Sequence, residues 1–190
     1  MSDEAPAGQE SALNEFTALR AEIIARQNSQ QGLLSIQLTA AGALFSLALS
    51  GAGRSAVLLI LPLITYMLAG RHVSHSYACT NIGAYVRTRL SPRVGDGLGW
   101  EQWLVEHRTK ASRSRSLNPL FITFPGISVL ALLGSLPYLV TLRMSVTAVM
   151  LWAGRLAGVG LAWSAARLVW NVRGDSFLRS GPAEVEPMNR

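Results

Sequence analysis

Arg155 is the residue whose type and position most call for a chemical explanation. It lies within an apolar segment, 145–168, and all Asp and Glu residues lie outside the four apolar segments of the chain. A central Arg costs about 2.5–3.5 kcal/mol on membrane-insertion scales, so it needs hydrogen-bond partners or water at that depth. The candidate partners are Gln37, Thr39, Ser46, backbone carbonyl groups and water.

Two interpretations of Arg155 remain open at this stage. In the first, the guanidinium lines an aqueous path that favours anions, with Gln37 as a second pore-lining candidate. In the second, the membrane segment begins near Leu156 and Arg155 snorkels outward to the surface. The first interpretation predicts that the Arg155→Gln variant has an altered ion selectivity.

Small residues predict places where helices touch. Gly154, Gly158 and Ala162 follow one another at a spacing of four, and Gly42 and Ser46 do the same in the first apolar segment. Such spacing puts small side chains on one helical face, where two backbones can approach closely. The partner helix can belong to the same chain or to another subunit, and the spacing does not distinguish these.

His72, His75 and Cys79 share a helical face, and imidazole and thiolate groups are ligands for zinc or copper. Three such residues on a single helix, without a fourth nearby, are typical of ordinary contacts, so we expect no metal and no cofactor. The sequence also lacks a Gly-rich phosphate loop, a G-x-S-x-G motif and paired carboxylates within the apolar segments. We therefore expect that the protein is not an enzyme.

A basic stretch, 71–119, separates two apolar halves and holds seven Arg and the only Lys of the chain. Its arginines could bind an anionic ligand, and the first candidates are Arg87, Arg89, Arg93 and Arg115. The alternative is the general excess of basic residues on the cytoplasmic side of membranes. Trp100 and Trp103 lie on one face of a short amphipathic helix, which is typical of interfacial anchors.

The composition explains how these residues must be positioned. Hydrophobic residues make up 49% of the chain and charged residues 15%, below the roughly 25% of a soluble domain. Four apolar segments, 33–50, 56–70, 120–140 and 145–168, flank the basic stretch, which Lys and Arg retain in the cytoplasm. We therefore predict an all-α integral membrane protein with four transmembrane helices, arranged as two hairpins with cytosolic helical extensions. Both termini would be cytoplasmic in a bacterial inner membrane, and the net charge of +6 needs no nucleic-acid partner.

The second helix of the first hairpin is expected to kink at Pro62 and to stop near Ser91 and Pro92. The chain as a whole divides into six parts. The parts are a disordered leader (1–10), a cytosolic amphipathic helix continuous with the first span (11–32), the first hairpin (33–70), a basic platform (71–119), the second hairpin (120–170) and a cytosolic tail (171–190).

Three short motifs carry a resemblance to known proteins. They are Glu-Phe-Thr-Ala-Leu-Arg-Ala-Glu-Ile at 15–23, Ile-Gly-Ala-Tyr-Val-Arg at 82–87 and Gly-Trp-Glu-Gln-Trp-Leu at 99–104. This part of the chain resembles small, uncharacterised four-span membrane proteins of actinobacterial type. It is more loosely similar to four-helix membrane effectors of nucleotide-triggered bacterial defence. The resemblance implies a cytosolic platform that senses a signal and a membrane part that opens, and it brings no catalytic residues.

The leading functional hypothesis is therefore an oligomeric channel or pore-type effector in the lipid bilayer. It would be gated through its cytosolic helices by a nucleotide or a protein signal. The alternative is a non-conducting scaffold or accessory subunit for a partner protein. A small transporter is disfavoured, because proton coupling commonly uses carboxylates within the membrane and these segments contain none.

Overall fold

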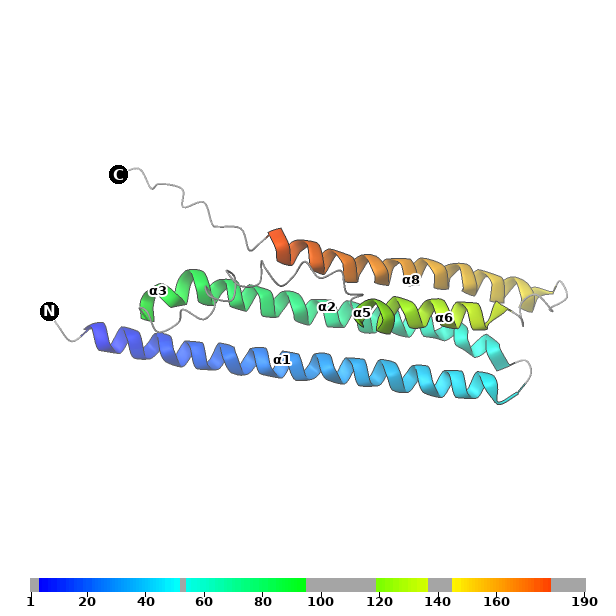
Figure 1. The fold of residues 1–190 in the computed structure, drawn as a ribbon, viewed down its shortest axis with the longest axis horizontal. Coiled ribbons are helices and arrows are strands. Elements are labelled where there is room, and N and C mark those ends of the chain that lie inside the picture. Colours follow the sequence, from blue (N-terminus) through cyan, green and yellow to red (C-terminus); the bar gives the residue numbers. More distant parts are fainter. Residues whose placement is uncertain (1–3, 52–53, 95–118, 137–144, 179–190) are drawn as a thin grey trace.

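The chain folds as a bundle of long helices in a computed structural model that describes residues 4–51, 54–94, 119–136 and 145–178 (Figure 1). All regular elements within these ranges are helical. They are α1 (Glu4–Leu49), the 3₁₀ helix η1 (Arg54–Ile60), α2 (Leu61–Tyr85), the π-helical turn η2 (Val86–Leu90), α3 (Ser91–Val94), α5 (Pro119–Phe121), the π-helical turn η4 (Ile122–Gly126), α6 (Ile127–Gly134) and α8 (Val146–Leu178).

Three described helices are long and apolar enough to cross a membrane: Gly8–Leu49, Arg54–Val94 and Val146–Asn171. The continuous run of α5, η4 and α6, hereafter the third helix, is apolar but shorter, from Pro119 to Gly134. The all-α class is confirmed for the described residues, and the three long helices have the length and composition of membrane spans. The end of the expected segment 120–140 lies partly outside the described residues.

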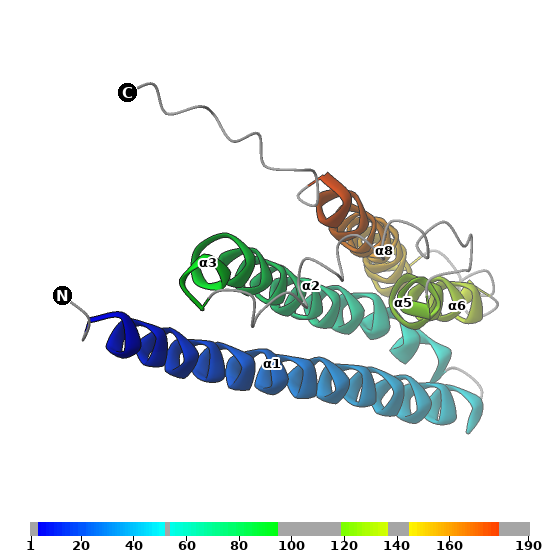
Figure 2. The ribbon, with the colours of Figure 1, turned by 60° about the vertical axis from the view of Figure 1, so that its left-hand side comes forward.

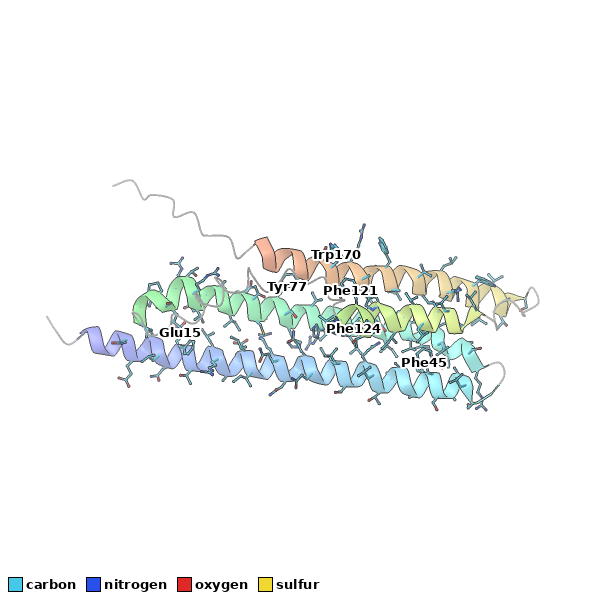
Figure 3. The ribbon with its side chains drawn as sticks, in the orientation of Figure 1. Glu15, Phe45, Tyr77, Phe121, Phe124 and Trp170 are labelled. Carbon is cyan, nitrogen blue, oxygen red and sulfur yellow. The ribbon has the colours of Figure 1, made fainter. Side chains whose placement is uncertain are left out.

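The central helix of the bundle is α2. It runs antiparallel to α1 and also contacts the third helix and α8 (Figures 1 and 2). The third helix packs against α8 as well, where the rings of Phe121 and Trp170 meet edge to face with centroids 6.1 Å apart (Figure 3). The four helices thus enclose a narrow core along α2.

Two apolar layers fill this core. The first apolar layer consists of Ala41, Leu58, Leu61 and Ala131, with Leu44 and Phe45 packed against it. The second apolar layer consists of Ala69, Phe124 and Ala165, with Leu34, Leu68 and Leu120 packed against it. Each layer draws residues from α1, α2 or its leading turn, and the third helix, so burial of these side chains fixes the register of the helices.

The N-terminal half of α1 and the C-terminal part of α2, with η2 and α3, run side by side, and their far ends project beyond the end of α8 (Figure 1). We call this two-helix extension, residues 8–32 and 71–94, the stalk. Its own small core contains Ala12, Val86, Leu90 and Val94. At the same level, the Tyr85 hydroxyl donates a hydrogen bond to Glu15 at 2.6 Å. The predicted cytosolic extensions of the first two apolar helices therefore pack on each other.

Helix ends differ from expectation at three places. The helix α1 already begins at Glu4, where Pro6 lies in the first turn and has no amide hydrogen bond to lose. At the other end, α8 continues to Leu178, into the expected tail. The second helix continues to Val94, beyond the expected stop near Ser91.

Wide helical turns explain why proline does not end these helices. The turn η2 precedes Pro92, and the amide of Ser91 donates to the carbonyl of Val86, five residues earlier. Pro125 lies inside η4, where the amide of Ile127 likewise donates to the carbonyl of Ile122. A π turn shifts the hydrogen-bond register by one residue, so the chain tolerates the missing proline donor. Pro62, the expected kink, lies at the junction where 3₁₀ helix η1 becomes α2.

Candidate functional site

Arg155 on α8 binds the C-terminal end of the third helix. The last helical residue of α6 is Gly134, and the amide of Ser135 closes the final turn by donating to the carbonyl of Ala131. The carbonyl of Leu132 lies one residue further on, where helices commonly lack an amide partner. Nη1 of Arg155 donates to the backbone oxygen of Leu132 and, at 2.9 Å, to Oγ of Ser135. The Ser135 hydroxyl itself donates to the Leu132 oxygen at 2.9 Å. The guanidinium therefore caps the third helix, where the helix dipole is negative and favours a cation.

The position of Arg155 on α8 directs it inward. Arg155, Gly158 and Ala162 share the helical face that packs on α2 and the third helix, and Arg155 is half-buried there. Of the candidate partners named from the sequence, a backbone carbonyl is the one that the structure pairs with Arg155. The guanidinium is directed toward the C-terminal end of the third helix. Whether it snorkels toward the membrane surface stays a prediction.

Gln37, the second pore-lining candidate, is fully buried between α1 and α2. Its Nε2 donates to Oγ1 of Thr65 at 2.8 Å. The structure does not bring Gln37 and Arg155 together, because Gln37 bonds to α2 while Arg155 bonds to the end of the third helix.

The predicted packing residues divide into two groups. A Cβ atom on Gly158 would lie 3.0 Å from Cδ2 of Leu132 and 3.3 Å from Cγ of Pro62, so Gly158 allows α8 to approach both neighbours. Ala162 is buried on the same face. The remaining three are exposed on the outside of the bundle: Gly154, Gly42 and Ser46. No described side chain lies within 4 Å of a Cβ position at Gly154 or Gly42.

Gly42 and Ser46 belong to a longer stripe that the sequence reading missed. Ten exposed residues, spaced alternately by four and three, follow the side of α1 opposite its buried Gln37. We call this stripe the α1 outer face: Asn14, Ala18, Ala21, Ala25, Asn28, Gly32, Ser35, Thr39, Gly42 and Ser46. The signal was present in the sequence as a seven-residue repeat of small and polar residues, rather than as hydrophobic ones.

Three of the four candidate anion-binding arginines gather at the tip of the stalk. Arg87 lies in η2 and is half-buried, while Arg89 and Arg93 are exposed on η2 and α3. Arg115 lies outside the described residues, as do the predicted interfacial anchors Trp100 and Trp103.

Acidic and phenolic groups lie beside these arginines. The hydrogen bond to Glu15 raises the pKa of Tyr85, and the charges of Arg93 and Arg89 act in the opposite direction. Figure 3 labels Glu15 on the stalk part of α1. The tip therefore combines the exposed guanidinium groups of Arg89 and Arg93 with the hydrogen bond that joins Tyr85 to Glu15 across the stalk.

Of the three possible metal ligands on α2, His72 is buried, and His75 and Cys79 are half-buried. Within the described residues, no three His, Cys, Asp or Glu side chains are grouped closely enough to hold a metal ion. The His72 ring lies against Phe124 with centroids 5.6 Å apart. Its backbone oxygen accepts a hydrogen bond from Nε2 of Gln30 at 3.2 Å, and the same nitrogen lies 2.7 Å from Oγ of Ser76. This contact joins α1 to α2 where the stalk meets the bundle.

Together, the fold and these contacts show a helical bundle in the described ranges, with helices apolar enough to cross a membrane, a stalk and a helix-capping Arg. Comparisons of the chain with protein-family models, with curated proteins and with solved structures find no match. The function is therefore argued from the residues and their geometry.

Proposed function

We propose that the protein is a four-span membrane protein that assembles through the α1 outer face into an oligomeric channel or pore-type effector, gated through its stalk. The observation that carries this proposal is the exposure of Gly32, Ser35, Thr39, Gly42 and Ser46 along the apolar half of α1. A helix face that contacts only lipid favours large apolar side chains, whereas small and hydroxyl-bearing residues favour another helix or a wetted path.

The capping of the third helix supports a fourth crossing. Its residues 119–134 span about 24 Å at 1.5 Å per residue, less than the roughly 30 Å of hydrocarbon. At the end of α6, the Ser135 amide donates to the carbonyl of Ala131, and Arg155 and the Ser135 hydroxyl both donate to the carbonyl of Leu132. Such bonds suit a helix end in hydrocarbon, where polar backbone groups must find their partners within the protein. With the basic residues of 71–119 in the cytoplasm, this topology places both termini there as well.

The α1 outer face supports self-assembly. Its alternating spacing repeats every 3.5 residues on average, which is the period at which two helices wind around each other in a left-handed sense. Its stalk half presents Ala18, Ala21 and Ala25, where a helix exposed to water usually carries charged residues. None of the ten residues is charged, so two copies can approach without burying an unpaired charge. We infer that the partner of this face is a second copy of the chain.

The stalk supports gating from the cytosol. Both α1 and α2 run without a break from the stalk into the bundle, and α1 alone is about 69 Å long. Hydrogen bonds from Gln30 and Gln37 join the two helices at two levels. An anionic nucleotide or an acidic protein segment bound by Arg89 and Arg93 would act on η2 and α3. These elements pack on α1 through the small core of the stalk, so α1 and α2 would carry the movement into the membrane.

Purified full-length protein tests the proposal through its mass in detergent, by light scattering, and its current in planar bilayers. We expect an oligomer that conducts. The Gly42→Leu variant should lose both properties, because Leu would hold the α1 outer faces apart. The control is Gly160→Leu, since Gly160 on α8 is also exposed and also has nothing within 4 Å of a Cβ position. A wild-type monomer, or equal behaviour of the two variants, would refute assembly through this face.

A second candidate, the non-conducting scaffold, is favoured by one observation. Arg155 and Gln37 are both hydrogen-bonded inside the chain, so these polar residues do not line a path through the described bundle. Under the channel proposal the path must then lie between copies. An oligomer that carries no current, with or without an added nucleotide, would support the scaffold instead.

A further inference from the structure

A layer of polar side chains lies in the middle of the bundle core. Gln37, Thr65 and Ser128 each have no exposed surface. Gln37 and Thr65 are hydrogen-bonded to each other. However, Oε1 of Gln37 and Oγ of Ser128 have no hydrogen-bond partner among the described residues. We call these three residues the polar layer.

The two unpartnered atoms lie at the same depth. Gln37 lies midway between the residues that α1 contributes to the two apolar layers, and Ser128 lies midway between those of the third helix. These flanking residues are Leu34 and Ala41 in α1, and Phe124 and Ala131 in the third helix. Because α1 and the third helix run in the same direction and share both apolar layers, Gln37 and Ser128 face the same level of the core. Thr65 completes this level, between Leu61 and Ala69 of α2.

The chemistry of the polar layer selects a neutral ligand. Oε1 of Gln37 can only accept a hydrogen bond, whereas the Ser128 hydroxyl can donate one. The three polar side chains are uncharged, so the layer offers neither a carboxylate for a cation nor a basic group for an anion. Unpaired polar atoms in an apolar core are costly, and buried water commonly satisfies two to four of them.

We propose that the polar layer binds an internal water molecule that donates to Gln37 Oε1 and accepts from the Ser128 hydroxyl. This water joins α1 to the third helix, while the Gln37 amide joins α1 to α2. The site therefore locks three helices in one register. It lies inside a single chain and does not depend on assembly through the α1 outer face.

The sign of the stability change in the Ser128→Ala variant tests the site. If a water accepts from Ser128, removal of the hydroxyl leaves that water and Gln37 poorly satisfied. The equilibrium constant for unfolding should then rise severalfold. If the hydroxyl is merely buried and unpaired, its removal should leave stability unchanged or raise it. The control is Ser29→Ala, an exposed Ser on α1 that lies outside the α1 outer face and whose hydroxyl bonds to its own helix.

A double-mutant cycle with Gln37→Leu makes the test specific to the bridge. In the wild type, Ser128→Ala should raise the equilibrium constant for unfolding by a factor at least about threefold larger than in the Gln37→Leu background. Additive effects, or a stabilising Ser128→Ala, would overturn the proposal. A coupling that appears in sodium chloride but not in choline chloride would overturn it as well, because it would assign the layer to a cation.

Discussion

Replacement of Arg155 by Met is the most direct test of the capped third helix. Met has a similar length and no charge, so the change removes both hydrogen bonds from the guanidinium while largely preserving the packing. The Leu132 oxygen keeps only its bond from Ser135, at the end of a helix surrounded by apolar residues. The expected result is a less stable bundle in which the third helix is most affected.

The magnitude follows from the two bonds that are lost, to Leu132 and to Ser135. Hydrogen bonds between membrane helices average about 0.6 kcal/mol and reach about 1.7 kcal/mol, so the pair contributes about 1–3 kcal/mol. The cost of placing Arg155 in the bilayer does not change this value. Unfolding separates helices that remain inserted, so the packed and the separated states carry the same insertion cost. The guanidinium charge places the expected value in the upper half of this range.

Unfolding in mixed detergent and dodecyl sulfate micelles, followed by far-UV circular dichroism, measures the change. The matched control is Arg167→Met on the same helix, since Arg167 is exposed and its guanidinium lies 5.7 Å from the Trp163 ring centroid. An exposed contact of this kind contributes at most about 1 kcal/mol. If Arg155→Met is no more destabilising than Arg167→Met, the cap is refuted. An altered ion selectivity of Arg155→Gln with unchanged stability would instead place the guanidinium in an aqueous path.

Three further results are expected. Gly158→Leu should destabilise the bundle by about 1–3 kcal/mol through contact with Leu132 and Pro62, while Gly154→Leu should not, as measured in the same unfolding assay. If the stalk tip binds anions as proposed, replacement of Arg93 by Gln should weaken the binding of a nucleoside triphosphate, as measured by calorimetry. The Tyr85–Glu15 hydrogen bond requires a protonated phenol. Its contribution to folding stability is therefore fully present below pH 10.0 and is lost as the pH rises through the raised pKa of Tyr85. Tyr85→Phe should remove that pH dependence, as seen in unfolding series around pH 10.

The residue types along the chain determined the class of this protein. Apolar segments and amphipathic stretches favour helix wherever they occur, so the helical class and the apolar helices could be read from local composition. The stalk was also predictable in part, because residues 13–26 alternate apolar and charged side chains with helical spacing. The proline positions misled the reading of helix ends, since a π turn next to Pro92 depends on the whole helix and not on the proline alone.

Only the tertiary structure decided which polar and small residues meet. A helix that is apolar on all sides gives no sign of which face touches protein and which touches lipid. The sequence therefore could not separate Gly158, which packs, from Gly154, which is exposed. Nor could it pair Arg155 with the carbonyl of Leu132, because a backbone group leaves no mark in the sequence and its availability depends on where the third helix ends. In this bundle, local chemistry sets the helices, and the contacts between them assign each polar group its partner.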